Sequence, residues 1–420
     1  MGKSLHQSKF MGKIHFKKAV SFFALASVFS LSACQKEDLV EEQAAVPALS
    51  QGVQASNIIE GQYIVVFKSK TESASEIIND LVASREVEKT GIKGIYNGRI
   101  KGFYGRLSKN QVQLLLHDPE VLSIEPDQLI SLGKPTKGGG GGGTTEPTPT
   151  PTPTPTDPTY AGLTVMAGET IPTGVAMVGY GDGAGRTAWV IDSGVDATHP
   201  DLNVDATRSV SFVTGVTSVQ DGFGHGTMVA GVIGAKNNGS GIIGVAANAT
   251  IVALRVLDDA GAGTLSNLIR AVDYVTTNGQ ANDVVNISIS AGASSTLDTS
   301  IKNCAAKGIF ISIAAGNSAV DCSNNSPQRV NATNVYTVSG MDYNKYFWSS
   351  SNFGAPVDRC APAVGVQTTT KGGGYTSYAN GTSFAAPHVA GLLLLKGNAM
   401  GSDGTVIGDK DNTPDPVAKL

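Results

Sequence analysis

Three polar residues, Asp192, His225 and Ser383, are of the types that catalyse by nucleophilic attack. Ser383 follows Asn-Gly-Thr and begins a small-residue and then leucine-rich segment, which is predicted to be a helix. Unpaired N–H groups at a helix start favour developing negative charge, which suits a nucleophile. A serine hydroxyl also needs a base to remove its proton. An ordinary helix cap would explain this serine equally well on its own.

His225 and Asp192 have the chemistry to activate such a serine. His225 lies between Gly224 and Gly226, which leave its ring approachable, as a general base requires. Asp192 ends an apolar run, where its carboxylate can accept a hydrogen bond from a histidine and stabilise the imidazolium. Before Ser193 and a glycine, however, Asp192 alone is more typical of a turn. Each candidate alone has an ordinary structural explanation, and only the three together indicate a catalytic site.

Apolar runs alternating with helical patterns must position these residues. Runs that are apolar on both faces and separated by helices are typical of a parallel sheet in an α/β fold. Function in such sheets lies beyond the carboxyl ends of the strands. Asn317 follows the last run and offers an amide donor there, although a turn asparagine is the alternative. The strands are predicted at 187–191, 251–256, 284–289 and 309–313, and helices at 264–277 and 297–307.

The motifs around Asp192, His225 and Ser383, in that order, resemble those of the subtilisin family of serine endopeptidases. An α/β-hydrolase is excluded because Ala385 stands where that motif has glycine, and because Asp and His precede the serine here. The resemblance implies a three-layer parallel-sheet catalytic domain over 160–420. It also implies that Asp192 orients His225, that His225 takes the proton from Ser383, and that Asn317 stabilises the oxyanion.

The same resemblance implies where protein or peptide substrates bind. Ser288, Ile289 and Ser290 match the edge that pairs with an extended peptide, and Leu265 matches an apolar residue of a more distant pocket. Ser290 replaces a glycine, which is expected to narrow the first pocket. Phe384 replaces a methionine beside the nucleophile and is expected to crowd the oxyanion site.

A structural Ca²⁺ ion is also implied, because the loop 236–242 aligns without gaps to a calcium-binding loop of subtilisins. Carboxylate, amide and carbonyl oxygens are the ligands that Ca²⁺ prefers, and a turn held by hydrogen bonds is the alternative. A second, weaker site, formed by Asp358 and the carbonyl groups of Thr333 and Val335, resembles that of the proteinase K branch, and a surface loop is the alternative. The ligands of the first site are predicted to be the side chains of Glu169, Asp201 and Asn238 and the carbonyl groups of Lys236, Ser240 and Ile242.

Residues 58–132 form a separate small domain with the predicted order β-α-β-β-α-β, a ferredoxin-like arrangement. This α+β domain resembles the propeptide of subtilisin-type proteases, which helps the enzyme to fold and then inhibits it. Without a protease after it, a small binding module would be the preferred interpretation. Residues 133–159 are a glycine and Thr-Pro linker that cannot form a core.

The first 33 residues are predicted to be a secretory signal, since lysines precede an apolar run that is short for a membrane span. Leu31-Ser32-Ala33-Cys34 resembles a bacterial lipoprotein signal. That resemblance implies a lipid on Cys34, a tether over 34–57 and attachment to the cell envelope before maturation. A buried free cysteine is the alternative.

Cys304, Cys322 and Cys360 remain once Cys34 is set aside, and an oxidising compartment allows three pairings among them. The resemblance to secreted subtilisins favours a bridge between Cys322 and Cys360.

Composition excludes one function class, and the motifs leave a favoured interpretation and an alternative. A net charge of −4 gives no basic field that would attract nucleic acid. The favoured interpretation is an exported, calcium-stabilised serine endopeptidase, a monomer made as a zymogen with its own propeptide as inhibitor. The alternative is a surface lipoprotein with impaired catalysis that binds peptides.

Overall fold

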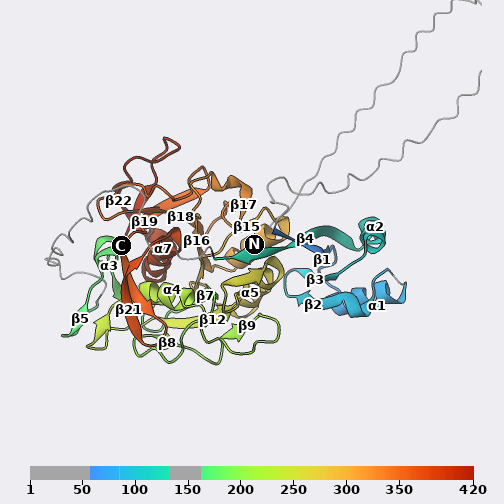
Figure 1. The fold of residues 1–420 in the computed structure, drawn as a ribbon, viewed down its shortest axis with the longest axis horizontal. Coiled ribbons are helices and arrows are strands. Elements are labelled where there is room, and N and C mark those ends of the chain that lie inside the picture. Colours follow the sequence, from blue (N-terminus) through green and yellow to red (C-terminus); the bar gives the residue numbers. More distant parts are fainter. Residues whose placement is uncertain (1–56, 85, 133–161) are drawn as a thin grey trace, which may run out of the picture. The chain divides into compact units, whose positions relative to one another are not determined.

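The computed structural model describes residues 57–84, 86–132 and 162–420 (Figure 1). The predicted signal, the linker, Cys34 and all but the last residue of the tether lie outside these residues. No helix in the described ranges has the length and apolarity needed to cross a bilayer.

The N-terminal domain has the predicted β-α-β-β-α-β order, and its sheet runs β4-β1-β3-β2 with antiparallel neighbours. Both helices begin with a capping box, Ser73 with Glu76 and Ser108 with Gln111, which satisfies N–H groups at each helix start. Its elements are β1 Ile58–Phe67, α1 Ala74–Ala83, η2 Lys89–Gly91, β2 Ile92–Asn97, β3 Lys101–Arg106, α2 Lys109–His117 and β4 Val121–Ser131.

The C-terminal part is built on one large sheet. Its strand order is β22-β23-β19-β18-β16-β14-β7-β12-β8, with β9 also paired to β12, and only β22 runs antiparallel to its neighbour. The strands are β7 Thr187–Asp192, β8 Asn203–Val204, β9 Val210–Ser211, β12 Thr250–Arg255, β14 Val284–Ile287, β16 Phe310–Ala314, β18 Val335–Met341, β19 Val357–Pro362, β22 Gly401–Thr405 and β23 Pro416–Lys419. The main helices are α4 His225–Gly234, α5 Leu265–Asn278, α6 Ser295–Ala305 and α7 Thr382–Lys396.

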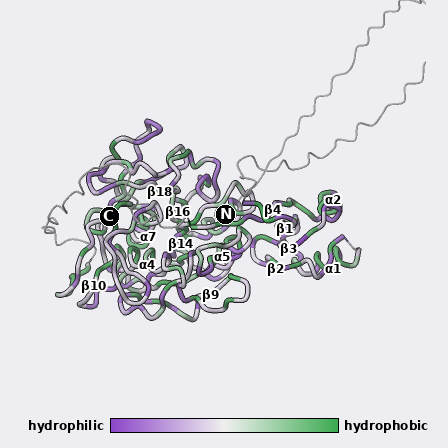
Figure 2. Tube along the Cα trace, viewed as in Figure 1, coloured by the Kyte–Doolittle hydropathy of each residue, from purple (hydrophilic) through white to green (hydrophobic). Residues whose placement is uncertain are grey.

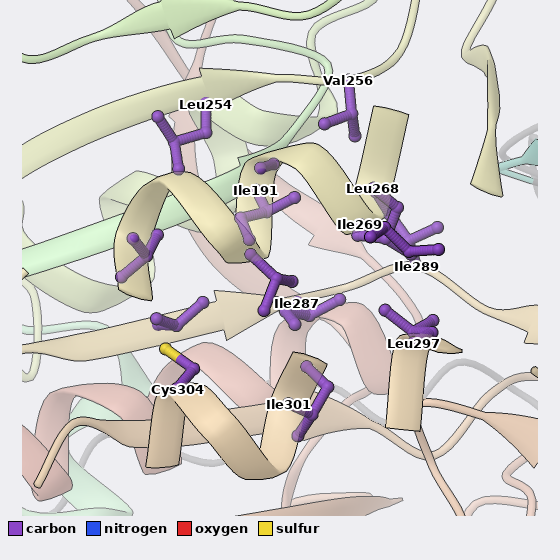
Figure 3. Close-up of a cluster of buried hydrophobic side chains, with 14 of the residues drawn as sticks. Ile191, Leu254, Val256, Leu268, Ile269, Ile287, Ile289, Leu297, Ile301 and Cys304 are labelled. Atoms are coloured by element: carbon purple, nitrogen blue, oxygen red, sulfur yellow. The ribbon is translucent and has the colours of Figure 1, made fainter. Parts of the chain in front are cut away.

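Alternate residues of the central strands point into two different cores, which gives three layers. Trp189 and Ile191 of β7 belong to a core that includes residues of α5 and α6, and Figure 3 shows side chains of both helices around Ile191. Ala188 and Val190 belong to a second core that includes residues of α4 and α7. In Figure 2 the hydrophobic colour is common along these buried elements, and hydrophilic stretches are common on the outer loops. The predicted α/β class is confirmed.

Shorter elements complete the chain. Small strand pairs and hairpins lie outside the large sheet: β5 with β10, β6 with β11, β15 with β17, and β20 with β21. Their bounds, with the remaining helices, are β5 Glu169–Thr170, α3 Thr173–Val178, β6 Gly181–Asp182, β10 Gly241–Ile242, β11 Ala246–Ala247, β13 Ala262–Thr264, β15 Ala291–Gly292, η3 Cys322–Asn324, β17 Asn325–Ser326, β20 Val366–Thr370, β21 Gly374–Ala379 and η4 Gly397–Ala399.

Candidate active site

Asp192 and His225 come from a strand and a helix that lie side by side in the fold, and they form a direct hydrogen-bonded pair. Asp192 is the last residue of β7 and is fully buried, and His225 is the first residue of α4. The His225 Nδ1 atom lies 2.9 Å from each carboxylate oxygen of Asp192, so this nitrogen donates its proton to the carboxylate. That bond fixes the tautomer in which Nε2 is free to accept a proton.

The charge balance around His225 favours its protonated form. Burial by itself lowers the pKa of His225, but the charge and hydrogen bond of Asp192, together with the charge of Asp221, outweigh burial and raise this pKa above its ordinary value. The imidazolium that forms when a base removes a proton is therefore stabilised where it would be produced.

Ser383 is the second residue of α7, in the first turn of that helix. Gly381 precedes this helix with φ at 142°, a region that favours glycine, and its N–H donates to the carbonyl oxygen of Ala363. Ser383 is buried. The ring of the next residue, Phe384, has its centroid 5.5 Å from that of the His225 ring. The first turns of α4 and α7 therefore lie close together, and each carries one of the predicted catalytic residues.

Asn317 is held against the same turn. Its Oδ1 atom accepts hydrogen bonds from the N–H of Thr382 at 2.9 Å and from the Thr382 hydroxyl at 2.8 Å. These two bonds fix the orientation of the amide, and its Nδ2 group is the donor that can serve a developing oxyanion.

The predicted substrate residues are either hydrogen-bonded to neighbouring segments or buried in a core. The Ser288 hydroxyl donates to the carbonyl oxygen of Ser383 at 3.1 Å. Gln328 donates to the carbonyl of Ile289 at 3.2 Å and accepts from the Ser290 hydroxyl at 3.3 Å. Leu265 is fully buried at the start of α5. The predicted strand 284–289 ends earlier, at Ile287.

Phe384 packs into an apolar cluster with Val232, Val366 and Ala379. Its ring also lies beside that of His225. The expectation that Phe384 crowds the oxyanion site stays a prediction.

The edge strand β13, which the sequence pattern does not predict, pairs with an extended segment. Residues 129–131 at the end of β4 pair antiparallel with Ala262–Thr264, and the N–H of Leu132 donates to the carbonyl oxygen of Gly261 at 3.0 Å. Ile130 is buried in the same cluster as Leu265. The N-terminal domain thus adds a strand to the catalytic part by main-chain pairing. A three-residue strand rich in glycine and alanine carries no hydrophobic pattern that could have predicted it.

Two carboxylates of β4 cap helices of the catalytic part. Asp127 accepts from the N–H of Ser266 at 3.0 Å and from its hydroxyl at 2.6 Å, in the first turn of α5. Glu125 accepts from the N–H of Thr296 at 3.0 Å and from the hydroxyl of Ser294 at 2.7 Å, at the start of α6. Carboxylates at helix N-termini are stabilised by the helix dipole and by the free N–H groups.

In a third contact the carboxylate belongs to the catalytic part and the N–H donors belong to the N-terminal domain. The Asp273 carboxylate of α5 accepts from the N–H of Arg99 at 3.1 Å, and the neighbouring N–H groups of Gly98 and Ile100 also donate to it. Burial raises the pKa of Asp273, and these hydrogen bonds oppose that rise. The turn between β2 and β3 is therefore anchored on α5 by backbone groups.

The predicted calcium loop surrounds two carboxylates. Glu169 Oε1 accepts from the N–H groups of Gly239 at 2.7 Å and Ser240 at 3.2 Å, while its Oε2 is buried without a hydrogen-bond partner. Asp201 accepts from Asn238 Nδ2 at 3.1 Å and from the N–H of Ile242 at 3.2 Å. Burial and the Glu169 charge raise the pKa of Asp201, against the hydrogen bond from Ile242.

These residues fit a hard cation. An orphaned carboxylate oxygen near a second buried carboxylate is unfavourable unless a positive charge compensates. No group of three or more His, Cys, Asp or Glu side chains in the described ranges is placed to hold a metal, so amide and carbonyl oxygens would supply the other ligands. At the weaker predicted site, Asp358 instead accepts from the N–H of Thr337 at 2.8 Å.

The predicted bridge between Cys322 and Cys360 is wrong, since both are free buried thiols, as is Cys304. Cys360 was expected in a loop but lies inside β19, where it packs with Met341 and Val417, whereas Cys322 begins η3. A disulfide requires converging side-chain directions, which loop position in a sequence does not establish. Burial raises the pKa of Cys304 and Cys322 to about 12 and also raises that of Cys360, so the thiolate is disfavoured.

Comparisons with known proteins agree with this geometry. Residues 183–402 match the subtilase family, and residues 62–132 match the peptidase inhibitor I9 family. The chain is 35% identical over 356 residues to alkaline serine protease ver112 of Corniculantispora psalliotae, which covers 83% of this chain and 84% of that protein. It is 33% identical over 344 residues to alkaline serine exoprotease A of Vibrio alginolyticus, covering 80% of this chain and 60% of that protein.

A solved structure of a cold adapted subtilisin-like serine proteinase shows the same fold. It is 35% identical, has a TM-score of 0.50, and covers 56% of this chain and 89% of the other. The chain therefore belongs to the subtilase family and is a subtilisin-like serine protease with a peptidase inhibitor I9 domain before its catalytic part.

Proposed function

We propose that this protease is an endopeptidase that cleaves peptide bonds through an acyl-enzyme on Ser383. His225 takes the proton of the Ser383 hydroxyl and returns it to the leaving amine, while Asp192 holds the imidazole and stabilises its charge. Asn317 donates from Nδ2 to the oxyanion. The observation that carries the proposal is the pair of 2.9 Å contacts between His225 Nδ1 and Asp192, beside the helix turn that bears Ser383.

Substrate is proposed to bind as an extended strand. The antiparallel pairing of 129–131 with β13 supports this binding mode, because an extended segment of the same chain already pairs with this edge. Leu265 and the segment from Ser288 to Ser290 are proposed to contact substrate side chains.

We propose further that the I9 domain inhibits the enzyme until the enzyme cleaves its own chain. The strand pairing at β13, the helix caps from Glu125 and Asp127, and the turn on Asp273 support this proposal. A segment held on the substrate edge by these contacts excludes other peptides while it remains bound.

Ca²⁺ is proposed as a structural ion at the loop 236–242. Glu169, Asp201 and Asn238 would hold it by side chains, and Lys236, Ser240 and Ile242 by carbonyl oxygens. When bound, the ion would compensate the charges of the two carboxylates. The residues that act on the peptide bond are separate from this loop.

Export, with a lipid on Cys34 before maturation, is proposed from the sequence of the first 34 residues. The domain limits 1–33, 34–57, 58–132, 133–159 and 160–420 belong to the same proposal. If cleavage falls in the linker, the lipid stays with the I9 domain and the enzyme is released.

A fluorophosphonate probe followed by intact mass and N-terminal sequencing tests the function. Wild type is expected to be labelled once, at Ser383, and to begin after residue 132. Ser383→Ala is expected to take no label and to keep its I9 domain. A folded wild type that takes no label would instead favour the alternative, a peptide-binding module without catalysis.

A further inference from the structure

Asp221 is a buried carboxylate four residues before His225 that the catalytic scheme does not use. Its Oδ1 accepts from the N–H of Gly224 at 2.6 Å and from the Ser193 hydroxyl at 2.8 Å. Its Oδ2 accepts from Thr227 twice, from the N–H at 2.8 Å and from the hydroxyl at 2.6 Å. Four donors saturate this carboxylate, and all of them belong to the two segments that carry Asp192 and His225.

These bonds replace a missing helix cap. The N-cap residue of α4 is Gly224, which has no side chain and adopts φ 109°. The second free N–H of the helix, on Gly226, donates to the Ser193 hydroxyl at 3.0 Å, and the third, on Thr227, donates to Asp221. The start of α4 is thus capped from outside the helix, which leaves small residues around the His225 ring.

The same network reaches Asp192. Ser193 follows Asp192 and donates its own N–H to the Asp192 carboxylate at 2.7 Å. The hydroxyl of Ser193 then joins Asp221 to the first turn of α4. Asp221 and Ser193 therefore join the end of β7 to the start of α4 through hydrogen bonds.

We propose that Asp221 is a positioning residue for the general base: with Ser193 it holds the first turn of α4, and so the His225 ring, against the carboxylate of Asp192. The proposal rests on the catalytic roles proposed above. Asp221 acts through His225 and is not itself expected to contact substrate.

Its charge adds a second effect that can be measured separately. The negative charge of Asp221 is one of the influences that raise the pKa of His225. Asp221→Asn removes the charge and turns one acceptor into a donor that faces N–H or O–H groups. Ser193→Ala removes the two hydrogen bonds that its hydroxyl makes, to Asp221 and from the N–H of Gly226, but keeps the charge of Asp221. Geometry and charge are therefore separated by two substitutions.

A matched control is Asp196, which is equally buried. Its carboxylate accepts from Thr198, from Gln220 and from the N–H of Gly372, and none of these donors lies in the first turn of α4. Asp196→Asn is expected to change stability without moving His225.

The test uses full-length chains that have matured, with active enzyme counted by fluorophosphonate labelling, and measures kcat and KM for a peptide substrate across pH. Asp221→Asn is expected to lower kcat by about 10- to 100-fold, which is no more than the whole contribution of a general base to the rate. Its KM is expected to stay within about twofold of the wild-type value. The acid limb of its pH profile, where kcat falls as His225 becomes protonated, is expected to move to lower pH. Ser193→Ala is expected to lower kcat with the acid limb unmoved, and Asp196→Asn to leave kcat and the limb as in wild type.

An Asp221→Asn enzyme with wild-type kcat and acid limb overturns the proposal, as does one whose changes equal those of Asp196→Asn. If Asp221→Asn does not fold, Ser193→Ala decides: a lower kcat supports the proposal and a wild-type kcat overturns it. Failure of the proposed function is distinguishable, because the folded wild type would then take no fluorophosphonate label and would not hydrolyse the substrate, whereas failure of the present proposal leaves the wild type active.

Discussion

The Nδ1 atom of His225 lies at the same distance, 2.9 Å, from both carboxylate oxygens of Asp192, although the two residues are 33 positions apart. β7 delivers the carboxylate at its end, and α4 delivers the ring as its first residue. The pair is buried, so water competes weakly for this bond.

Replacing Asp192 with asparagine should remove the charge and allow the wrong histidine tautomer. We expect kcat to fall by about 10,000-fold, as in other Ser-His-Asp enzymes. Asp403→Asn on the surface is the control. An Asp192→Asn enzyme that keeps more than a tenth of the wild-type kcat would contradict the assigned role.

Catalysis should be lost on the acid side of neutrality. Only neutral His225 can accept a proton, and its pKa is raised above the ordinary value of about 6.5. The kcat/KM value should therefore fall as pH drops through a midpoint above about 6.5, and be constant well above it. A midpoint clearly lower than this in a pH profile would show that Asp192 and Asp221 do not outweigh burial.

Asn317→Ala should lower kcat more than it raises KM, because the oxyanion exists only in the transition state. We expect a loss of about 100- to 1000-fold, which is the range known for removing one such donor from a subtilisin. Asn344→Ala, at an exposed site, should have no effect. Equal losses in both variants would contradict the role of Asn317.

Calcium should raise the melting temperature of the wild-type enzyme, and Glu169→Gln should abolish most of that rise. A ligand at 100 times its Kd stabilises a folded protein by about 2.7 kcal/mol. Thermal unfolding with Ca²⁺ and with chelator measures the effect, with Asp403→Asn as control. An equal calcium response in Glu169→Gln would place the ion elsewhere.

The Asp127 cap should stabilise the inhibited form. In a Ser383→Ala background, which cannot process itself, Asp127→Asn replaces one acceptor oxygen with an N–H₂ group beside the donors of Ser266. This change should cost about 1–3 kcal/mol in unfolding free energy. Asp80→Asn, on the exposed side of α1, controls for loss of charge. Identical denaturation curves for the two variants would show that the cap contributes little.

Hydrophobic patterns predicted the main elements because they depend on local sequence. The runs at 187–191 and 309–313 became β7 and β16, and the order of the I9 domain was correct throughout. Both signals rest on periodicity and turn residues, which one segment contains by itself.

The predicted bridge between Cys322 and Cys360 was wrong and β13 was not predicted, and both failures have the same reason. Whether two thiols converge, or whether Ala262–Thr264 pairs with a strand, depends on partners more than a hundred residues away or on side-chain direction. Neither property can be inferred from the local sequence pattern.

By itself, the sequence determined the residue types able to catalyse, their order and the alternation of strands and helices, because motif chemistry and periodicity are local properties. Only the tertiary structure decided that Asp221 and Ser193 cap α4 from outside, and that Glu125 and Asp127 cap helices of the catalytic part. A carboxylate can serve any N–H group that the fold brings within about 3 Å, so its partner follows from packing rather than from its neighbours in the chain.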